Sequence, residues 1–321
     1  ESRGLGDVYK RQEYIVDVLK SQTDNIAKED AYTLALFAQD EIKLLRNLQA
    51  LIGVRYIYHE NFKNHATPNV ALMYKPGKFN FRASYAAGFR TPTLSELYAT
   101  DIAKKNDRLT IGNLDLKPEK NNYFSLSAEY VHERFSVSVN AFYNNIRDMI
   151  DYNTIATGDK AMEQYGHKEV RQRDNIAEAK VHGINVSANA YLGAGFNLSG
   201  GYTHLNTQDV ELEQPIDKSI KNAYNINAQW AHSWKIYRLN INLNGRFNSK
   251  RFSKSYGYAP EYQLWDLNTR HSFNLKSVII EPGCGMENLF DYMDDRPYNS
   301  NYATLTPGRS FYISLSLKFK S

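Results

Sequence analysis

Hydrophobic and polar residues alternate one by one along most of the chain, from about residue 31 onward. The final segment is the clearest case, because Phe311, Ile313 and Leu315 alternate with Tyr312 and Ser314. Successive side chains of a β-strand point to opposite faces, so a period of two gives each strand one apolar and one polar face. The pattern therefore predicts an all-β protein built from amphipathic strands.

Thirteen such strands are predicted from this alternation. Their ranges are 31–44, 47–59, 67–75, 79–87, 121–131, 135–152, 173–192, 196–209, 219–232, 237–252, 264–273, 277–288 and 308–319. Most are longer than the ~5–6 residues typical of strands in soluble sheets. Their length suits the ~9–11 residues that a tilted strand needs to cross a bilayer.

The connections between the predicted strands alternate between very short and long. The short ones are 45–46, 76–78, 132–134, 193–195, 233–236 and 274–276. The long ones are roughly 60–66, 88–120, 153–172, 210–218, 253–263 and 289–307. Tight turns at one end of a sheet and long loops at the other are typical of outer-membrane barrels.

Aromatic residues flank the short connections, as Tyr130 and Phe135 do around one turn and Tyr191 and Phe196 around the next. Rings with an apolar body and a polar edge are stable at a membrane–water boundary, where barrels carry aromatic girdles. A soluble β-sandwich is the alternative, but it has no reason to sort its loops by length. The sequence therefore predicts a transmembrane antiparallel β-barrel.

Composition agrees with this picture once the alternation is known. The mean hydropathy is −0.58, and no uncharged apolar run reaches the ~18–20 residues of a spanning helix. The single cysteine, Cys284, excludes a disulfide framework and a multi-cysteine metal site. A net charge of +4 is too balanced to indicate nucleic-acid binding. No catalytic motif is present, so we expect no enzyme, no resident cofactor and no metal site.

The two ends of the chain carry separate expectations. Residues 1–12 share no pattern with the rest, and we expect them to be a non-native read-through, with a native loop as the alternative. Residues 14–19 resemble the remnant of a further strand. Single-chain barrels have an even number of strands, whereas thirteen is odd. Residues 13–321 are therefore expected to be the C-terminal part of a larger barrel.

Four segments in combination resemble TonB-dependent outer-membrane receptors. They are ASYAAGFRTPTLSELY at 83–98, GNLDLKPE at 112–119, NLFD at 288–291 and AQDE at 38–41. The resemblance implies a 22-stranded barrel closed by an N-terminal plug, of which this chain would supply about the last 13 strands. It also implies location in the outer membrane and energy from TonB–ExbB–ExbD, contacted through an N-terminal region outside this sequence.

Members of that family import nutrients that are scarce, so the resemblance implies transport of an iron–siderophore or haem, with cobalamin possible. A glycan-importing receptor of the same family and a passive outer-membrane porin are the alternatives. A barrel enzyme and a soluble adhesin are further alternatives. The first would need a clustered set of catalytic residues at the long-loop end, and the second would be freely soluble.

Five residues in the long loops are candidates to face a ligand. Arg90 and Arg108 carry charge that could meet an anionic siderophore or the phosphates of lipopolysaccharide. Tyr98, His65 and His167 carry donors that haem iron accepts. Each of them could equally be a solvated loop side chain.

The last strand resembles the signal that the outer-membrane barrel assembly machinery recognises. That signal has a glycine, alternating hydrophobic residues and a terminal aromatic residue. The matching positions are Gly308, Tyr312, Leu315, Leu317 and Phe319. Two further residues follow Phe319, which departs from the pattern, and an ordinary amphipathic strand is the alternative. Outer-membrane lipid is a further expected partner of this barrel.

Overall fold

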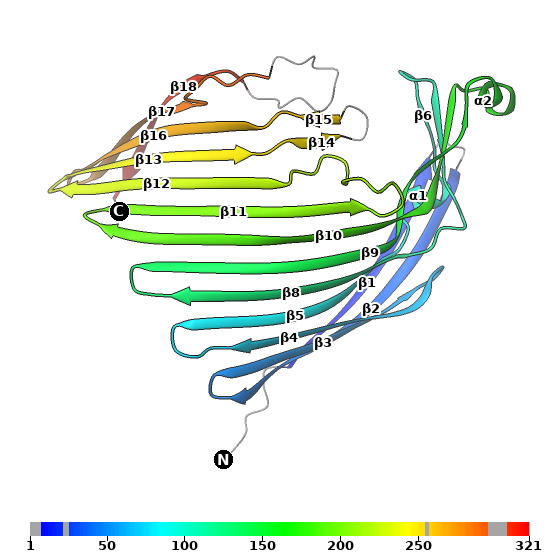
Figure 1. The fold of residues 1–321 in the computed structure, drawn as a ribbon, viewed down its shortest axis with the longest axis horizontal. Coiled ribbons are helices and arrows are strands. Elements are labelled where there is room, and N and C mark those ends of the chain that lie inside the picture. Colours follow the sequence, from blue (N-terminus) through cyan, green and yellow to red (C-terminus); the bar gives the residue numbers. More distant parts are fainter. Residues whose placement is uncertain (1–7, 22–25, 254–256, 295–306, 321) are drawn as a thin grey trace.

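The computed structural model describes residues 8–21, 26–253, 257–294 and 307–320. Most of them form one long, strongly curved sheet that resembles a wall of an opened cylinder (Figure 1). Each strand along the wall is antiparallel to the next one in the chain, so hairpin follows hairpin from one edge to the other. Within the described part of the chain, no helix is long and apolar enough to cross a membrane.

Fourteen strands follow one another along this wall. They are β1 (Val8–Ser21), β2 (Ile26–Leu45), β3 (Leu48–His59), β4 (Lys63–Tyr74), β5 (Phe79–Arg90), β8 (Glu119–Val131), β9 (Phe135–Thr157), β10 (Glu169–Gly193), β11 (Phe196–Asp209), β12 (Asn222–Trp234), β13 (Tyr237–Asn248), β16 (Tyr262–Asn274), β17 (Val278–Glu287) and β18 (Ser310–Phe319). The predicted all-β class and the hairpin order are confirmed. Each of the thirteen predicted strands has a counterpart.

The fourteenth strand is β1, which includes the segment expected to be a strand remnant. It pairs with β2 in an antiparallel register that joins Tyr14 to Leu34 and Lys10 to Ala38. Residues 8–12 therefore belong to the sheet, although their sequence pattern had excluded them from the predicted fold. Residues 1–7 lie outside the described residues. The non-native origin of residues 1–12 stays a prediction.

Several strands extend further toward the long-loop end than their alternation predicts. β4 begins at Lys63, so the predicted long loop 60–66 is wrong and is only a short turn. β9 continues to Thr157 and β10 begins at Glu169, which shortens the predicted loop 153–172. These extensions pair with their neighbours through their backbones, and such pairing does not require an alternation of apolar and polar side chains. The alternation ends before the strand does.

Short elements decorate the long-loop end, which is the right-hand end in Figure 1. They are α1 (Leu94–Tyr98), β6 (Thr100–Ala103), β7 (Arg108–Ile111), α2 (Gly158–Tyr165), β14 (Arg251–Ser253) and β15 (Gly257–Ala259). β7 pairs in parallel with the start of β10, whereas every other strand pair is antiparallel among the described residues. Contacts between distant segments thus concentrate at this end.

The two faces of the sheet differ as the period of two predicts. On β18, Phe311, Ile313 and Phe319 are 69%, 88% and 80% exposed. Apolar side chains along the same face of the other strands are exposed as well, though less so, such as Leu126 at 62% and Ile184 at 44%. The opposite face carries polar ladders, such as Ser84 bonded to Ser125 across β5 and β8. An exposed apolar face on a continuous sheet is the face that a barrel presents to lipid.

The opposite end consists of tight turns ringed by aromatic side chains. Phe79, Tyr130 and Phe135 form a chain of ring contacts at 4.8 Å and 5.6 Å between centroids. Phe196 lies 5.9 Å from Trp230 around the next turns. The predicted clustering of aromatics at the short connections is confirmed.

Candidate functional site

The centre of the long-loop end is an ion cluster around Arg90, the last residue of β5. Its Nη1 donates to Glu96 Oε2 at 2.9 Å. Its Nε and Nη2 donate to the two carboxylate oxygens of Glu119 at 2.7 Å and 2.6 Å. We call these three residues the Arg90 clamp. It joins β5, helix α1 and the first residue of β8, so it fixes both ends of the connection 91–118.

Local sequence places Glu96 for this contact. Thr93 caps α1, and Glu96 N–H donates to Thr93 Oγ1 at 3.2 Å while Thr93 N–H donates to Glu96 Oε2 at 2.9 Å. This is a reciprocal capping box. Burial alone raises the pKa of the Glu96 carboxyl, but the hydrogen bonds from Arg90 and Thr93 outweigh it and hold the pKa below its ordinary value.

A small apolar cluster beside the clamp packs the same connection against β9 and the turn before β4. Leu97, Leu116 and Ile150 are all buried and contact one another. Phe62 and Tyr98 pack against them. The connection 91–118 is therefore packed onto the wall by buried side chains, which is unusual for a long loop. Tyr98, a predicted haem-iron donor, lies at the edge of this cluster.

His65 does not lie in a loop, which corrects its predicted position. It belongs to β4, and its ring stacks on Phe89 with 3.8 Å between centroids. Its Nε2 lies 2.8 Å from the backbone oxygen of Phe62. The polar sequence around residue 65 reads as a loop, but pairing with β3 extends the strand through it.

His167 and Arg108 lie at the junction of β7 and β10. His167 follows α2, and its Nδ1 is 2.9 Å from Asp107 Oδ1. The hydrogen bond from His167 lowers the pKa of the Asp107 carboxyl. Arg108 is the first residue of β7, and its buried Nε has no hydrogen-bond partner among the described residues. His167 and Arg108 are close neighbours, because His167 contacts Asp107, the residue before Arg108. Their wide separation in the sequence did not predict this proximity.

The five sequence candidates thus fall into two groups. Tyr98 lies within the folded connection 91–118, Arg90 ends β5 immediately before it, and His65 joins them through Phe89 and Phe62. Arg108 and His167 lie at the β7–β10 junction. Arg90 was expected to face a ligand as a cation, whereas its guanidinium contacts two carboxylates. A ligand role for the five stays a prediction.

Sequence reasoning missed Glu96 and Glu119 as partners of Arg90. The capping box Thr93-x-x-Glu96 was visible in the sequence and marks the start of α1. Glu119 had no such signal, because its position opposite Arg90 follows from the register between β5 and β8.

A second polar region lies on the polar face of the sheet, on β12 and β13. Asn227 Nδ2 donates to Asn242 Oδ1 at 2.7 Å, and Gln229 Nε2 donates to Asn240 Oδ1 at 3.2 Å. These side chains line a hollow of about 280 Å³ together with Arg270 and Tyr312. Amides and a guanidinium bind polar groups of a solute or of a protein domain. No group of three or more His, Cys, Asp or Glu side chains in the described part could hold a metal ion.

The C-terminal strand carries the predicted assembly signal. Gly308 precedes β18, and Leu315, Leu317 and Phe319 lie on the apolar face, each of them at least half exposed. Tyr312 lies on the polar face and borders the hollow described above. The geometry is that of an amphipathic edge strand, and its recognition by an assembly machinery stays a prediction.

A curved antiparallel wall with an apolar outer face, an aromatic girdle at the tight-turn end and a polar inner face is a β-barrel wall of the outer membrane. The model of the family described as "TonB dependent receptor-like, beta-barrel" matches residues 3–289. The chain therefore belongs to the TonB-dependent receptors, an outer-membrane family of transporters that are not enzymes.

The solved structures with the same fold include several receptors named for siderophores. The ferric enterobactin receptor PfeA of Pseudomonas aeruginosa superposes with a TM-score of 0.80 at 19% identity, covering 98% of this chain and 51% of that one. PirA of the same organism gives 0.74 at 17% identity, covering 98% and 53%. BauA of Acinetobacter baumannii, a ferric preacinetobactin receptor, gives 0.65 at 18%, covering 90% and 43%. The chain spans about half the length of these receptors.

Proposed function

We propose that this chain is the C-terminal barrel part of a receptor that imports a ferric siderophore. The supporting observation is the likeness of its wall, along nearly its whole length, to barrels whose printed names are siderophore receptors. The folded long-loop end and the amide-rich inner face give a polar route for such a ligand.

Energy for this import would come from TonB, ExbB and ExbD through a plug and an N-terminal segment beyond this sequence. The 22-stranded barrel implied by the resemblance leaves room for the additional strands. β1 and β18 each pair on one side only among the described residues, so each offers a backbone edge to a neighbouring strand. An unpaired edge in lipid is not tolerated, which supports further strands between them.

A second candidate is haem import, and His167 is the observation that favours it. Its Nδ1 is held by Asp107, which leaves Nε2 as the donor, and a carboxylate behind an imidazole is the usual support of a metal-ligating histidine. Against haem, His65 is engaged by Phe62 and Phe89, and Tyr98 packs on an apolar cluster.

Growth of a deletion strain under iron limitation tests the proposal. We expect loss of growth on one ferric siderophore, normal growth on haem, and restoration by the wild-type gene but not in a strain lacking TonB. Loss on haem alone, abolished again by His167→Ala in the restored strain, would favour the second candidate. Normal growth on siderophores, haem and cobalamin would contradict iron import and indicate a glycan or another nutrient. Restoration without TonB would indicate a passive porin.

A further inference from the structure

The polar face of the sheet is not uniform, because four neighbouring strands carry no charge on it. At every second position, β9, β10, β11 and β12 each present six residues to this face, over 136–146, 179–189, 197–207 and 223–233. None of these residues is Asp, Glu, Lys or Arg, although such residues make up 23% of the chain. We call this surface the neutral panel.

The side chains of the neutral panel are short or end in amides. Ser138 and Ser187 bond across β9 and β10 with 2.7 Å between their hydroxyl oxygens. Thr203 Oγ1 donates to Asn185 Oδ1 at 3.0 Å across β11 and β10. Such side chains end close to the backbone, whereas a long side chain such as arginine extends further inward. The panel therefore leaves more of the lumen free than a wall of long side chains does.

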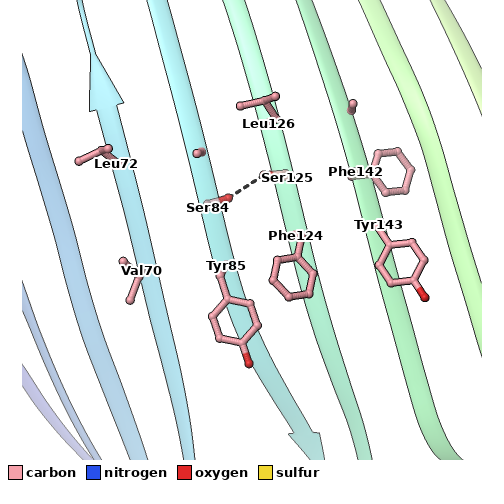
Figure 2. A pocket seen from close by; sticks show the side chains of 11 residues that line it. Val70, Leu72, Ser84, Tyr85, Phe124, Ser125, Leu126, Phe142 and Tyr143 are labelled. Carbon is pink, nitrogen blue, oxygen red and sulfur yellow. Dashed lines mark hydrogen bonds between the residues drawn. The ribbon is translucent and has the colours of Figure 1, made fainter.

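The strands on both sides of the panel are charged on the same face. Within the described strands, β5, β8, β13 and β16 place there Arg82, Glu129, Arg238, Arg246, Asp266 and Arg270. Ser84 and Ser125, on β5 and β8, form a serine pair with 2.6 Å between the hydroxyl oxygens (Figure 2). This pair matches the Ser138–Ser187 pair of the panel, yet Ser84 lies two residues from Arg82 on the same face. The lumen thus has a neutral side between two charged sides.

A hollow crosses the neutral panel near the tight-turn end. Its volume is about 390 Å³, and each strand of the panel contributes to its lining, through Ser136, Asn189, Ser199 and Gln229. Residues 132–134 of the β8–β9 turn line it as well, so it lies at the end of the wall. Asn227 and Gln229 also line the hollow of about 280 Å³ described above, so the two hollows adjoin. The short turns of such barrels face the periplasm.

The chemistry of the panel suits a solute that passes and does not stay. A transported solute must bind its route strongly enough to enter and weakly enough to leave. Hydrogen bonds that involve a charged group are roughly twice as strong as those between neutral groups. The charged sides therefore hold what they contact, such as a domain that fills the lumen, whereas the panel exchanges its partners more readily. Amides and hydroxyls both donate and accept, so they match hydroxyl, carbonyl and amide groups.

We propose that the imported solute passes along the neutral panel and leaves the barrel through the hollow at its foot. Such a route rests on the import proposed above, and it adds the side of the barrel that the solute uses. The hollow selects for hydroxyl, carbonyl and amide groups on the surface of the solute and does not require a particular net charge.

Cysteine labelling of the whole receptor in cells tests this route. The new cysteine replaces Ser187 in the panel or Ser84 in the charged side, in a Cys284→Ser background that removes the single cysteine of residues 1–321. Ser187→Cys and Ser84→Cys are matched, because each removes one hydroxyl of a cross-strand serine pair in the middle of a strand. The probe is a membrane-impermeant fluorescein maleimide, added to cells with and without TonB. Heat-modifiable migration on a gel confirms that each variant is folded.

Ser187→Cys should react several-fold faster than Ser84→Cys in cells that contain TonB, and the difference should shrink in cells that lack it. A maleimide joined to a polymer too large for the route should label neither site. Equal rates at the two sites, or a difference that does not depend on TonB, would overturn the proposal. Slower reaction of Ser187→Cys would overturn it as well, because the panel would then be covered by a domain in the lumen. Labelling of both sites by the polymer would indicate an open pore in place of a route along one side.

Labelling requires no nutrient, so its outcome is independent of the growth experiment. If growth identifies a nutrient other than a siderophore, the two labelling rates still test the neutral panel. If the two rates are equal, the side of the barrel is wrong, while the import of a ferric siderophore is unaffected.

Discussion

The two ends of the barrel wall are stabilised by different means. At the tight-turn end, each connection is a few residues long and neighbouring rings from adjacent hairpins pack on one another. At the long-loop end, the Arg90 clamp and the Leu97–Leu116–Ile150 cluster join segments far apart in sequence. The first end is determined by local backbone geometry, and the second by contacts that exist only once the wall has formed. Substitutions at the tight-turn end should therefore destabilise the whole barrel wall. Substitutions at the long-loop end should loosen only the local connection.

The largest effect is expected at a turn glycine. Gly195 has a φ of 86°, and a Cβ there would overlap the backbone oxygen of Ala231. Gly195→Ala should destabilise the folded barrel by about 3 kcal/mol, because left-handed strain and overpacking add. Gly77→Ala is the control, since Gly77 has a φ of 63° but open space around it, and it should cost about 1 kcal/mol. Urea unfolding in lipid vesicles measures both. Equal effects would show that contact with β12 is irrelevant.

The next effect concerns the clamp at the other end. Arg90→Met removes the cation from two largely buried carboxylates and should loosen the connection 91–118 by roughly 2 kcal/mol, a figure reduced for the 42% exposure of Arg90. Protease cleavage within 91–118 should accelerate while urea unfolding of the wall stays unchanged. Arg90→Lys should rescue little, because an ammonium cannot form the two-pronged contact with Glu119. Simultaneous loss of the whole barrel would contradict local action.

A similar but smaller local effect is expected in the apolar cluster. Leu116 is 4% exposed, and Leu116→Ala should loosen the same connection by about 2 kcal/mol through lost contacts and a cavity. Leu114, two residues away, is 66% exposed and serves as the control, for which Leu114→Ala should have almost no effect. Hydrogen exchange of residues 94–118 measures the difference. Identical exchange in the two variants would show that the cluster does not hold the connection.

The smallest effect is the response to acid. The folded-state pKa of Glu96 is below its ordinary value, so the clamp's contribution is complete above the ordinary carboxyl pKa near ~4.3 and is lost as pH falls through the lowered one. Protease cleavage of 91–118 should therefore rise below about pH 4, by an amount equivalent to roughly 1 kcal/mol. Glu96→Gln should be readily cleaved at every pH and should keep only the part of the acid response that comes from Glu119, the other carboxylate of the clamp. A wild-type profile that is no steeper than that of Glu96→Gln would remove Glu96 from the clamp.

Features set by local sequence could be predicted, whereas features set by contacts between distant segments could not. The strands over 121–131 and 237–248 follow directly from alternation, and so do their turns. His65 was assigned to a loop because Lys63 and Asn64 are polar, yet backbone pairing with β3 makes them strand. α1 was missed although its capping box is local. β6 and β7 were missed because they are short, and β7 is stabilised by pairing with β10 about 60 residues later in the chain.

The sequence by itself determined the strands, their two faces and the end at which the turns are tight. A period of two is a local property, because each residue's face depends only on its neighbours in the chain. The tertiary structure alone decided that Arg90 meets Glu96 and Glu119, and that His167 meets Asp107. These contacts depend on the register between strands. Many backbone pairs together set that register, so no short sequence motif encodes it.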